Sequence, residues 1–242
     1  MGRARLVVLL CLTSRTAASQ ASAPAGPLAR WPEAIGFVAV AATAFVTDGV
    51  IRRTIQGHTT GFRNGAAGVG NAYGNPKYVL PALSLATIGA GLAGSDDLYD
   101  AGRRALKSEV LATGTTLVLK SLIGRRRPDV APHDPYRFNP FSLAYNSLPS
   151  GHTATAFALA TSLAMETEGS LLDIGLYGMA ATTAFARMHV DKHWASDTVV
   201  GAAIGILAAR LVHRHDRSDE SGSPAARTTR GEGVTLRVDF AF

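Results

Sequence analysis

Three short groups of residues contain side chains that can bind an anion or transfer a proton. The first group is Lys120, with Arg127 and Pro128 beyond a six-residue gap. A lysine near a helix end and an arginine just past it can direct both charges at one anion, because arginine binds two oxygens through its planar fork and lysine acts as a compact charge. The same pattern alone is typical of an ordinary basic helix end, where cations complement the helix dipole.

The second group is Pro149-Ser150-Gly151-His152-Thr153, directly before an alanine-rich helical segment. Ser150 is suited to cap that helix, which is the simplest interpretation of the group. A helix N-terminus also directs free backbone N–H groups at an anion, and Gly151 allows close approach because it has no Cβ. His152 in the first turn can donate a proton to an ester oxygen, although a lone histidine here is also compatible with a solvent-exposed position.

The third group is Arg187, then His193, then Asp197. His193 and Asp197 are four residues apart on a predicted helix, so they are expected to share a face. A carboxylate that accepts from one imidazole nitrogen fixes the tautomer and leaves the other nitrogen free to attack a substrate. An incidental histidine–aspartate pair on a helix surface has the same spacing.

In this order and at these spacings, the three groups resemble the type 2 phosphatidic-acid phosphatase and vanadium haloperoxidase superfamily. The family pattern is K-x6-R-P, then P-S-G-H, then S-R-x5-H-x3-D, and the resemblance spans roughly residues 114–209. The one departure is Ala186, where many members have serine. This change removes a small hydrogen bond beside Arg187 but neither a charge nor a nucleophile.

The resemblance implies a metal-independent phosphohydrolase that forms a phosphohistidine on His193. Asp197 would hold the imidazole of His193, and His152 would protonate the departing alkoxide. Three cations around the phosphoryl group supply the charge stabilisation that other phosphatases obtain from metals, so no metal or other cofactor is expected. The phosphate would be bound by the remaining residues of the three groups, Lys120, Arg127, Ser150, Gly151 and Arg187.

The formal charge of +6 and the pI of about 9.8 indicate an anionic partner, and part of the excess lies in Arg125-Arg126-Arg127. This clustering favours a discrete anion site over a nucleic-acid surface, because no aromatic residues alternate with the arginines. Arg125 and Arg126 are expected to attract anions or to be solvated rather than to contact the phosphate. The other histidines form no carboxylate-rich cluster and are assigned to surface or packing roles: His58, His133, His189, His213 and His215.

The fold class predicted from the sequence is all-α, a bundle of about six core helices with a short strand-like C-terminal tail. Strand-like alternation is rare before residue 234, and Ser95-Asp96-Asp97 is typical of a helix start. The loop Arg125–Leu148 contains four prolines and is expected to be functional. The helices are predicted from uncharged segments at Ala34–Thr47, Tyr78–Ser95, Val110–Leu119, Thr153–Met165, Ile174–Ala186 and Thr198–Ala209.

The chain is predicted to begin with a secretory signal at residues 1–23, with two arginines, a short apolar run and a small-residue cleavage region. A linker at 24–32, a helical domain at 33–215 and a flexible tail at 216–242 follow. The tail ends in Val234–Phe242, which alternates apolar and polar residues as a strand does. Cys11 is the only cysteine and lies in the predicted signal, so the mature chain would have no disulfide.

The predicted signal favours export to the periplasm. A water-soluble bundle is favoured there, because the apolar segments are mostly shorter than the roughly 20 residues that cross a bilayer. An integral inner-membrane protein with a periplasm-facing site is the alternative. The expected substrate is a phosphate monoester or pyrophosphate on a lipid, a polyprenyl chain or a small soluble molecule. Two other functions remain open: a haloperoxidase with vanadate as cofactor, and a non-catalytic phosphate-binding membrane protein.

Overall fold

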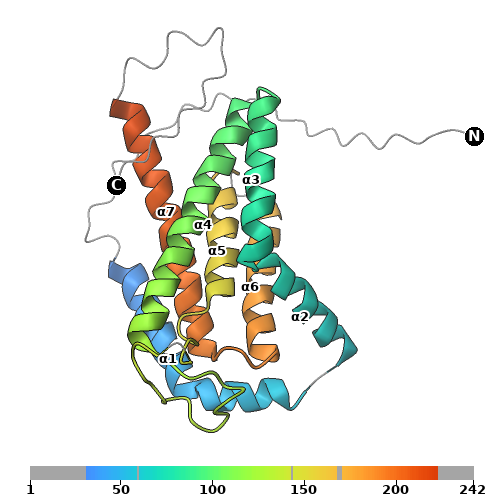
Figure 1. Ribbon diagram of the computed structural model, residues 1–242, viewed down its shortest axis with the longest axis vertical. Coiled ribbons are helices and arrows are strands. Elements are labelled where there is room, and N and C mark those ends of the chain that lie inside the picture. Colours follow the sequence, from blue (N-terminus) through green and yellow to red (C-terminus); the bar gives the residue numbers. More distant parts are fainter. Residues whose placement is uncertain (1–30, 59, 143, 168–170, 223–242) are drawn as a thin grey trace, which may run out of the picture. The chain divides into compact units, whose positions relative to one another are not determined.

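A computed structural model describes residues 31–58, 60–142, 144–167 and 171–222, and these residues form helices joined by irregular segments (Figure 1). The chain divides at Gly36, and the helices that build the site lie in the unit from Phe37 onward. The prediction of an all-α fold is confirmed, and the described residues contain no sheet. Their seven helices are α1 (Trp31–Gln56), α2 (Gly61–Tyr73), α3 (Pro76–Leu92), α4 (Asp96–Ile123), α5 (Gly151–Ala164), α6 (Leu171–His189) and α7 (Ala195–Gly222).

Helix α2 was not among the predicted helices because glycines and polar residues conceal it in the sequence. Its start is capped by Thr60, whose hydroxyl accepts from the backbone N–H of Arg63 at 3.3 Å. Its buried residues are Ala67 and Gly70, and a Cβ on Gly70 would lie 2.6 Å from the carbonyl oxygen of Thr182 in α6. The backbone of α2 therefore lies directly against α6 at Gly70, and Tyr73 at its end packs against the core.

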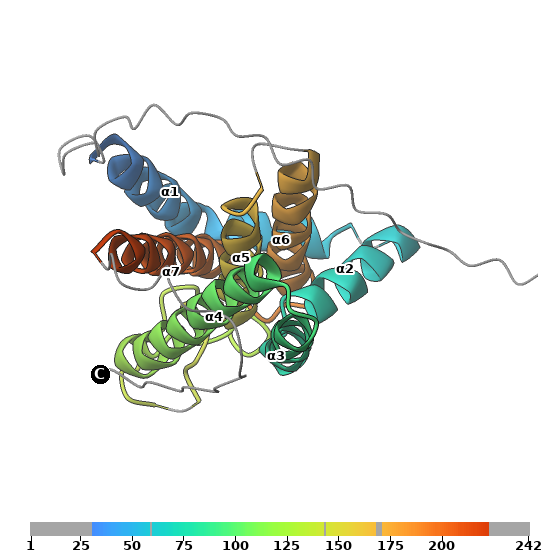
Figure 2. The ribbon, with the colours of Figure 1, turned by 90° about the horizontal axis from the view of Figure 1, so that it is seen from above.

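Helix α5 lies at the centre of the bundle, in contact with α4, α6 and α7 (Figure 2). Glycines on α7 allow the closest approach, since Cβ atoms on Gly201 and Gly205 would lie 2.5 and 2.3 Å from the carbonyl oxygens of Ser150 and Ala154. The core consists of small side chains in two clusters, one of Ala112, Ala154, Ala158 and Ala208 and one of Ala156, Ala160 and Ala180.

The segment between α4 and α5 turns back at Gly124, which ends α4 in the left-handed conformation with φ 60°. A side chain cannot replace this glycine, because its Cβ would lie 2.0 Å from the carbonyl oxygen of Asn139. The turn carries the chain away from Lys120 and returns it to Ser150 at the start of α5.

The helical region is longer than predicted, since α1 begins at Trp31 and α7 continues to Gly222. Ser95 precedes α4 as predicted, although its side chain makes no capping hydrogen bond. The predicted signal, the linker up to residue 30 and the strand-like segment Val234–Phe242 lie outside the described residues.

Two of the described helices are long and apolar enough to cross a membrane, at Ile35–Gln56 and Ala195–Arg217. In the first segment 11% of the apolar stretch is buried inside the protein, and in the second 44%. Large apolar side chains are also exposed on α3 and α4, including Leu85, Ile88, Leu92, Val110, Leu117 and Val118.

The glycine contacts predict that Gly205→Ala lowers stability. The added Cβ would meet backbone atoms of α5, which cannot move aside, and overpacking of this kind costs about 1–3 kcal/mol. The measurement is thermal unfolding of the purified chain. Gly114→Ala is the matched control, because Gly114 lies in α4, its added Cβ would meet no atom within 4 Å, and alanine favours a helix by up to about 1 kcal/mol. Equal melting temperatures for Gly205→Ala and wild type would contradict this packing.

Candidate active site

The three groups of residues lie at one end of the bundle, where α4 and α6 end and α5 and α7 begin (Figure 1). Lys120 is in the last turn of α4, and Arg127 follows on the returning loop. Ser150 and its neighbours begin α5, and Arg187 is in the last turn of α6. The remaining pair lies at the start of α7.

His193 does not lie on a helix, so the prediction that it shares a helical face with Asp197 is wrong. It belongs to the short connection before α7, whereas Asp197 is in the first turn of that helix. The cause is Asp197 itself, whose Oδ2 accepts the backbone N–H of Trp194 at 2.9 Å. This is the back-bonding of a capping box, which starts the helix at Ala195 and leaves His193 outside it.

The two side chains nevertheless face each other, with His193 Nδ1 3.5 Å from Asp197 Oδ2. That separation is long for a hydrogen bond. The carboxylate is held on its other sides by the Ser147 hydroxyl at 2.5 Å, the Trp194 N–H and the Arg125 guanidinium at 2.7 Å. Asp197 is thus fixed as an acceptor directed at Nδ1, an arrangement that leaves Nε2 of His193 as the nitrogen available for attack.

Burial keeps His193 neutral. It lowers the pKa of His193 to about 4, and the hydrogen-bonding and charge effects of Asp197 oppose the shift only in part. The positive charges of Lys120 and Arg187 lower the pKa further. At neutral pH the imidazole therefore has an unprotonated nitrogen, which a nucleophile requires.

Lys120, Arg127 and Arg187 converge without a carboxylate partner. None of the three forms a salt bridge within the part of the chain that the structure describes, and the Nε atoms of both arginines are buried without a hydrogen-bond partner. Burial, and then the charge of Arg127, lowers the pKa of Lys120 to about 8. Unpaired cations this close together form a site that is complementary to a compact anion.

The neighbours of Lys120 and Arg187 fix where their side chains point. Lys120 Nζ donates to the carbonyl oxygen of Asn146 at 2.6 Å, and Arg187 Nη1 donates to Asn71 Oδ1 at 2.7 Å. Asn71 lies on α2, in a region from which the sequence predicted no site residue. No motif indicates it, because its role depends only on the contact between α2 and α6.

The start of α5 lies beside these cations. Ser150 caps the helix as predicted, since its Oγ accepts from the backbone N–H of Thr153 at 3.4 Å and from the Thr153 hydroxyl at 2.9 Å. A Cβ on Gly151 would lie 4.0 Å from Lys120 Cε and would meet no closer atom than Thr116 Oγ1 at 3.8 Å. Contacts within the protein therefore do not require a glycine at this position. The physical reason for Gly151 is the open space that it keeps beside Lys120.

His152 occupies the first turn of α5, close to the same cations. Burial, and then the charge of Arg187, lowers the pKa of His152 to about 3, so the imidazole is neutral in the absence of an anion. A bound phosphate would offset the surrounding positive charge and raise this pKa again.

The expectation that Arg125 is solvated or steers anions is wrong. Its side chain is fully buried and forms salt bridges with Asp48 and Asp197, each at 2.7 Å. Three aromatic rings surround the guanidinium, those of Phe45, Trp194 and Phe138, at 4.9, 5.4 and 5.7 Å from their centroids. A clue in the sequence is the lone carboxylate Asp48 at the end of an apolar helical segment, which must find a partner if it is buried.

Arg126 is partly buried. Its Nη1 donates to the Tyr145 hydroxyl at 3.2 Å, and its guanidinium lies 5.4 Å from the ring centroid of Tyr145. Two of the remaining histidines, His189 and His213, are buried against Asn64 and Ser162 respectively. Among the described residues, no group of three or more histidine, cysteine, aspartate or glutamate side chains is arranged to hold a metal ion.

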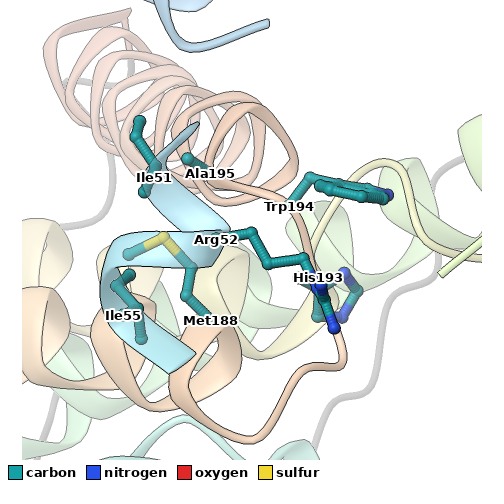
Figure 3. A pocket seen from close by; sticks show the side chains of 7 residues that line it. All are labelled: Ile51, Arg52, Ile55, Met188, His193, Trp194 and Ala195. Carbon is teal, nitrogen blue, oxygen red and sulfur yellow. The ribbon is translucent and has the colours of Figure 1, made fainter. Parts of the chain in front are cut away.

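A small pocket lies beside His193 on the side of α1 (Figure 3). It contains neither Lys120 nor Arg187, so it is separate from the cation cluster. Figure 3 shows Arg52 extending from α1 toward the connection that carries His193. The lining residues are Ile51, Arg52, Ile55, Met188, His193, Trp194 and Ala195.

Three cations without a salt bridge among the described residues thus accompany a buried histidine–aspartate pair, an arrangement complementary to a compact anion. Residues 103–218 match the PAP2 superfamily, so the chain contains a PAP2 superfamily domain. The resemblance inferred from the three groups of residues is thereby confirmed.

Two kinds of comparison support this assignment. The chain is 44% identical over 77 residues to the lipid A 1-phosphatase of Porphyromonas gingivalis, a match that covers 31% of this chain and 17% of that protein's length. Its fold is similar to the crystal structure of Aquifex aeolicus LpxE, with a TM-score of 0.52, 24% identity, and 68% and 93% of the two chains covered. It is also similar to the transmembrane PAP2-type phosphatidylglycerolphosphate phosphatase of Bacillus subtilis, with a TM-score of 0.59, 20% identity, and coverage of 81% and 96%.

The lowered pKa of Lys120 predicts a basic limit to anion binding. Below about pH 8 the ammonium is charged and holds an anion, and above that pH it loses its proton and attraction weakens. The inhibition constant of inorganic phosphate should therefore rise above about pH 8 in wild type. In Lys120→Arg the side chain stays charged, and this rise should be absent up to about pH 10. An identical pH profile in the two proteins would show that Lys120 does not contribute its charge.

Proposed function

We propose that this protein is a phosphatase that cleaves phosphate monoesters or pyrophosphates carried on lipids, without a metal and through a phosphohistidine. The observation that carries the proposal is the convergence of Lys120, Arg127 and Arg187, unpaired by carboxylates, beside a neutral histidine whose Nδ1 faces Asp197. Two of the proteins named above are phosphatases by name, and the lipids in those names are lipid A and phosphatidylglycerolphosphate.

In the proposed first step, Nε2 of His193 attacks phosphorus while the bond to the ester oxygen breaks. The three cations and the N–H groups at the start of α5 stabilise the charge of the phosphoryl group. His152 gives its proton to the departing alkoxide, because the bound phosphate raises the pKa of its imidazole in the complex. Asp197 stabilises the positive charge that develops on His193.

In the second step, water attacks the phosphohistidine. His152, now neutral, accepts a proton from the water as the oxygen bonds to phosphorus and the P–N bond breaks. Inorganic phosphate leaves, and both histidines return to their initial state. The charge of the three cations replaces that of a metal ion in this scheme, and orthovanadate, which becomes five-coordinate, is expected to inhibit competitively.

We further propose that the protein is exported and embedded in the inner membrane, with the active site facing the periplasm. The sequence favours a water-soluble bundle, but the exposed apolar side chains on α3 and α4 and the two helices long enough to cross a bilayer support the alternative. Large contiguous apolar patches are rare on the surface of a folded monomer in water. A lipid substrate fits the same location.

His193→Ala is expected to abolish formation of the phosphoenzyme. Wild type incubated with a ³²P-labelled lipid phosphate and quenched in base should retain label on protein, because phosphohistidine survives base and not acid. The variant should retain none and should turn over at least about 1,000-fold more slowly, the size expected when a nucleophile is lost. His58→Ala is the control, since His58 is exposed, its ring contacts only the carbonyl oxygen of Thr54, and it takes no part in the steps above.

Equal labelling of wild type and His193→Ala would overturn the proposed nucleophile. The assays are run with EDTA, and activity that disappears in EDTA and returns with a divalent cation would contradict a metal-independent reaction. The substrate panel compares a lipid phosphate, a polyprenyl pyrophosphate and p-nitrophenyl phosphate.

Membrane embedding predicts that the expressed protein stays with the membrane fraction after washing with alkaline carbonate. Integral proteins resist this wash, whereas soluble and peripheral proteins are released by it. Recovery of active protein in the periplasmic extract would favour the soluble bundle instead.

A further inference from the structure

Helix α1 carries three polar side chains, Asp48, Arg52 and Gln56, at intervals of four residues. Residues with this spacing lie on one face of a helix. All three precede residue 103 and so lie outside the segment that matches the PAP2 superfamily. Each of them contacts the connection between α6 and α7 or the first turn of α7.

Asp48 is fully buried and acts on the start of α7. Its Oδ1 accepts the backbone N–H of Ser196 at 2.9 Å, and its Oδ2 accepts the Ser196 hydroxyl at 2.6 Å and Arg125 Nη2 at 2.7 Å. Arg125 Nη1 in turn donates to Asp197 Oδ1. Asp48 therefore provides an acceptor for a free N–H of the helix terminus and orients the arginine that holds Asp197.

Arg52 and Gln56 act on the connection just before His193. Arg52 binds the carboxylate of Asp191 with both ends of its fork, at 2.8 Å from Nε and 2.6 Å from Nη2. Gln56 Nε2 donates to the carbonyl oxygens of Met188 and His189 at 3.1 and 3.2 Å. Asp191 has φ 57°, a left-handed conformation that few non-glycine residues adopt and that surrounding contacts must maintain.

The apolar side chains of α1 attach the helix to the rest of the protein only in part. Its apolar side chains Val46 and Val50 are exposed, and it makes few contacts with other helices. Its attachment consists of polar contacts to neighbouring segments, of Phe45, which packs against Tyr136 with ring centroids 5.1 Å apart, and of Ile51 and Ile55, which line the small pocket beside His193. Figure 3 shows one of the three polar side chains, Arg52, extending from α1 toward the connection that carries His193.

We propose that Asp48, Arg52 and Gln56 are positioning residues that hold residues 188–197 so that Asp197 faces Nδ1 of His193 during the chemical step. The inference rests on the proposed function, because it assigns to α1 the task of orienting the proposed nucleophile. None of the three needs to contact the phosphate.

Asp48→Asn is the most direct test, because it keeps the volume of the side chain and removes one acceptor. In either amide orientation an NH₂ group would face a donor, from Ser196 or from Arg125. The expected result is a kcat about 10–100-fold below wild type. This is the range found when hydrogen-bond partners of metal-bound histidines are removed, and those partners orient an imidazole in a similar way. KM should change less than about threefold and the inhibition constant of inorganic phosphate less than about twofold, because the three cations remain in place.

Thr54→Val is the matched control on the same helix. Thr54 is exposed, and its hydroxyl donates only to the carbonyl oxygen of Val50 within α1, at 3.1 Å. Its kcat should equal that of wild type. A kcat of Asp48→Asn within about twofold of wild type, or a loss that lies entirely in KM and phosphate affinity, would overturn the proposal.

A second measurement does not depend on turnover. In the full chain labelled with ¹⁵N-histidine, the His193 signals, assigned by their loss in His193→Ala, should show one neutral tautomer protonated on Nδ1. Asp48→Asn should show a mixture of tautomers, and unchanged signals would overturn the proposal. If wild type cleaves no phosphate ester, the proposed function fails while this tautomer measurement still decides the role of Asp48.

Arg52→Gln replaces Asp48→Asn if the latter does not fold. Arg52 is partly exposed, so its loss leaves no uncompensated charge in the core. The same fall in kcat and the same mixed tautomers are expected, because Asp191 loses its bidentate partner. Wild-type kcat and a single tautomer in Arg52→Gln would count against the positioning role.

Discussion

The buried guanidinium of Arg125 is the interaction on which the arrangement of this site depends. It lies between the carboxylates of Asp48 and Asp197, and three aromatic rings exclude water around it. Removing one partner of a buried ion pair typically costs about 3–5 kcal/mol, because the other charge remains in the core. The network therefore fixes α1, the loop after α4 and the start of α7 with respect to one another.

Next to this neutralised arginine, the protein leaves a second set of cations without carboxylates. Lys120, Arg127 and Arg187 repel one another, and the lowered pKa of Lys120 reflects burial first and then this repulsion. A fold tolerates such a cluster only if stabilisation elsewhere offsets it. The neutralised cation, Arg125, holds the structure together. The cations without carboxylate partners are available to an anion.

Small residues make it possible for the helices to bring these groups together. Gly201 and Gly205 bring α7 against the carbonyl oxygens of Ser150 and Ala154, so the start of α5 lies directly beside the start of α7. The backbone N–H of Ser150 donates to the carbonyl oxygen of Asp197 at 2.9 Å across this contact. The capping serine is thus joined to Asp197 through the backbone.

Much of the chemistry was readable from the sequence. The order and spacing of Lys120, Arg127, Ser150, His152, Arg187, His193 and Asp197 predicted the superfamily, because each motif is local and keeps its spacing whatever the rest of the chain does. The all-α class followed in the same way from uncharged segments without strand-like alternation. Helix α2 was missed because it is short and rich in glycine and polar residues, and its close approach to α6 at Gly70 leaves no signal in the sequence.

What only the tertiary structure decided were the partners of these residues. Arg125 and Arg127 are two positions apart in one basic run, yet one is buried between two carboxylates and the other lacks a salt bridge among the described residues. Asp48 and Asp197 are far apart in the chain, and Arg125 contacts both of them. Sequence spacing determines which side chains can act on their near neighbours, whereas burial and long-range contacts determine which charges are neutralised and which remain free for a substrate.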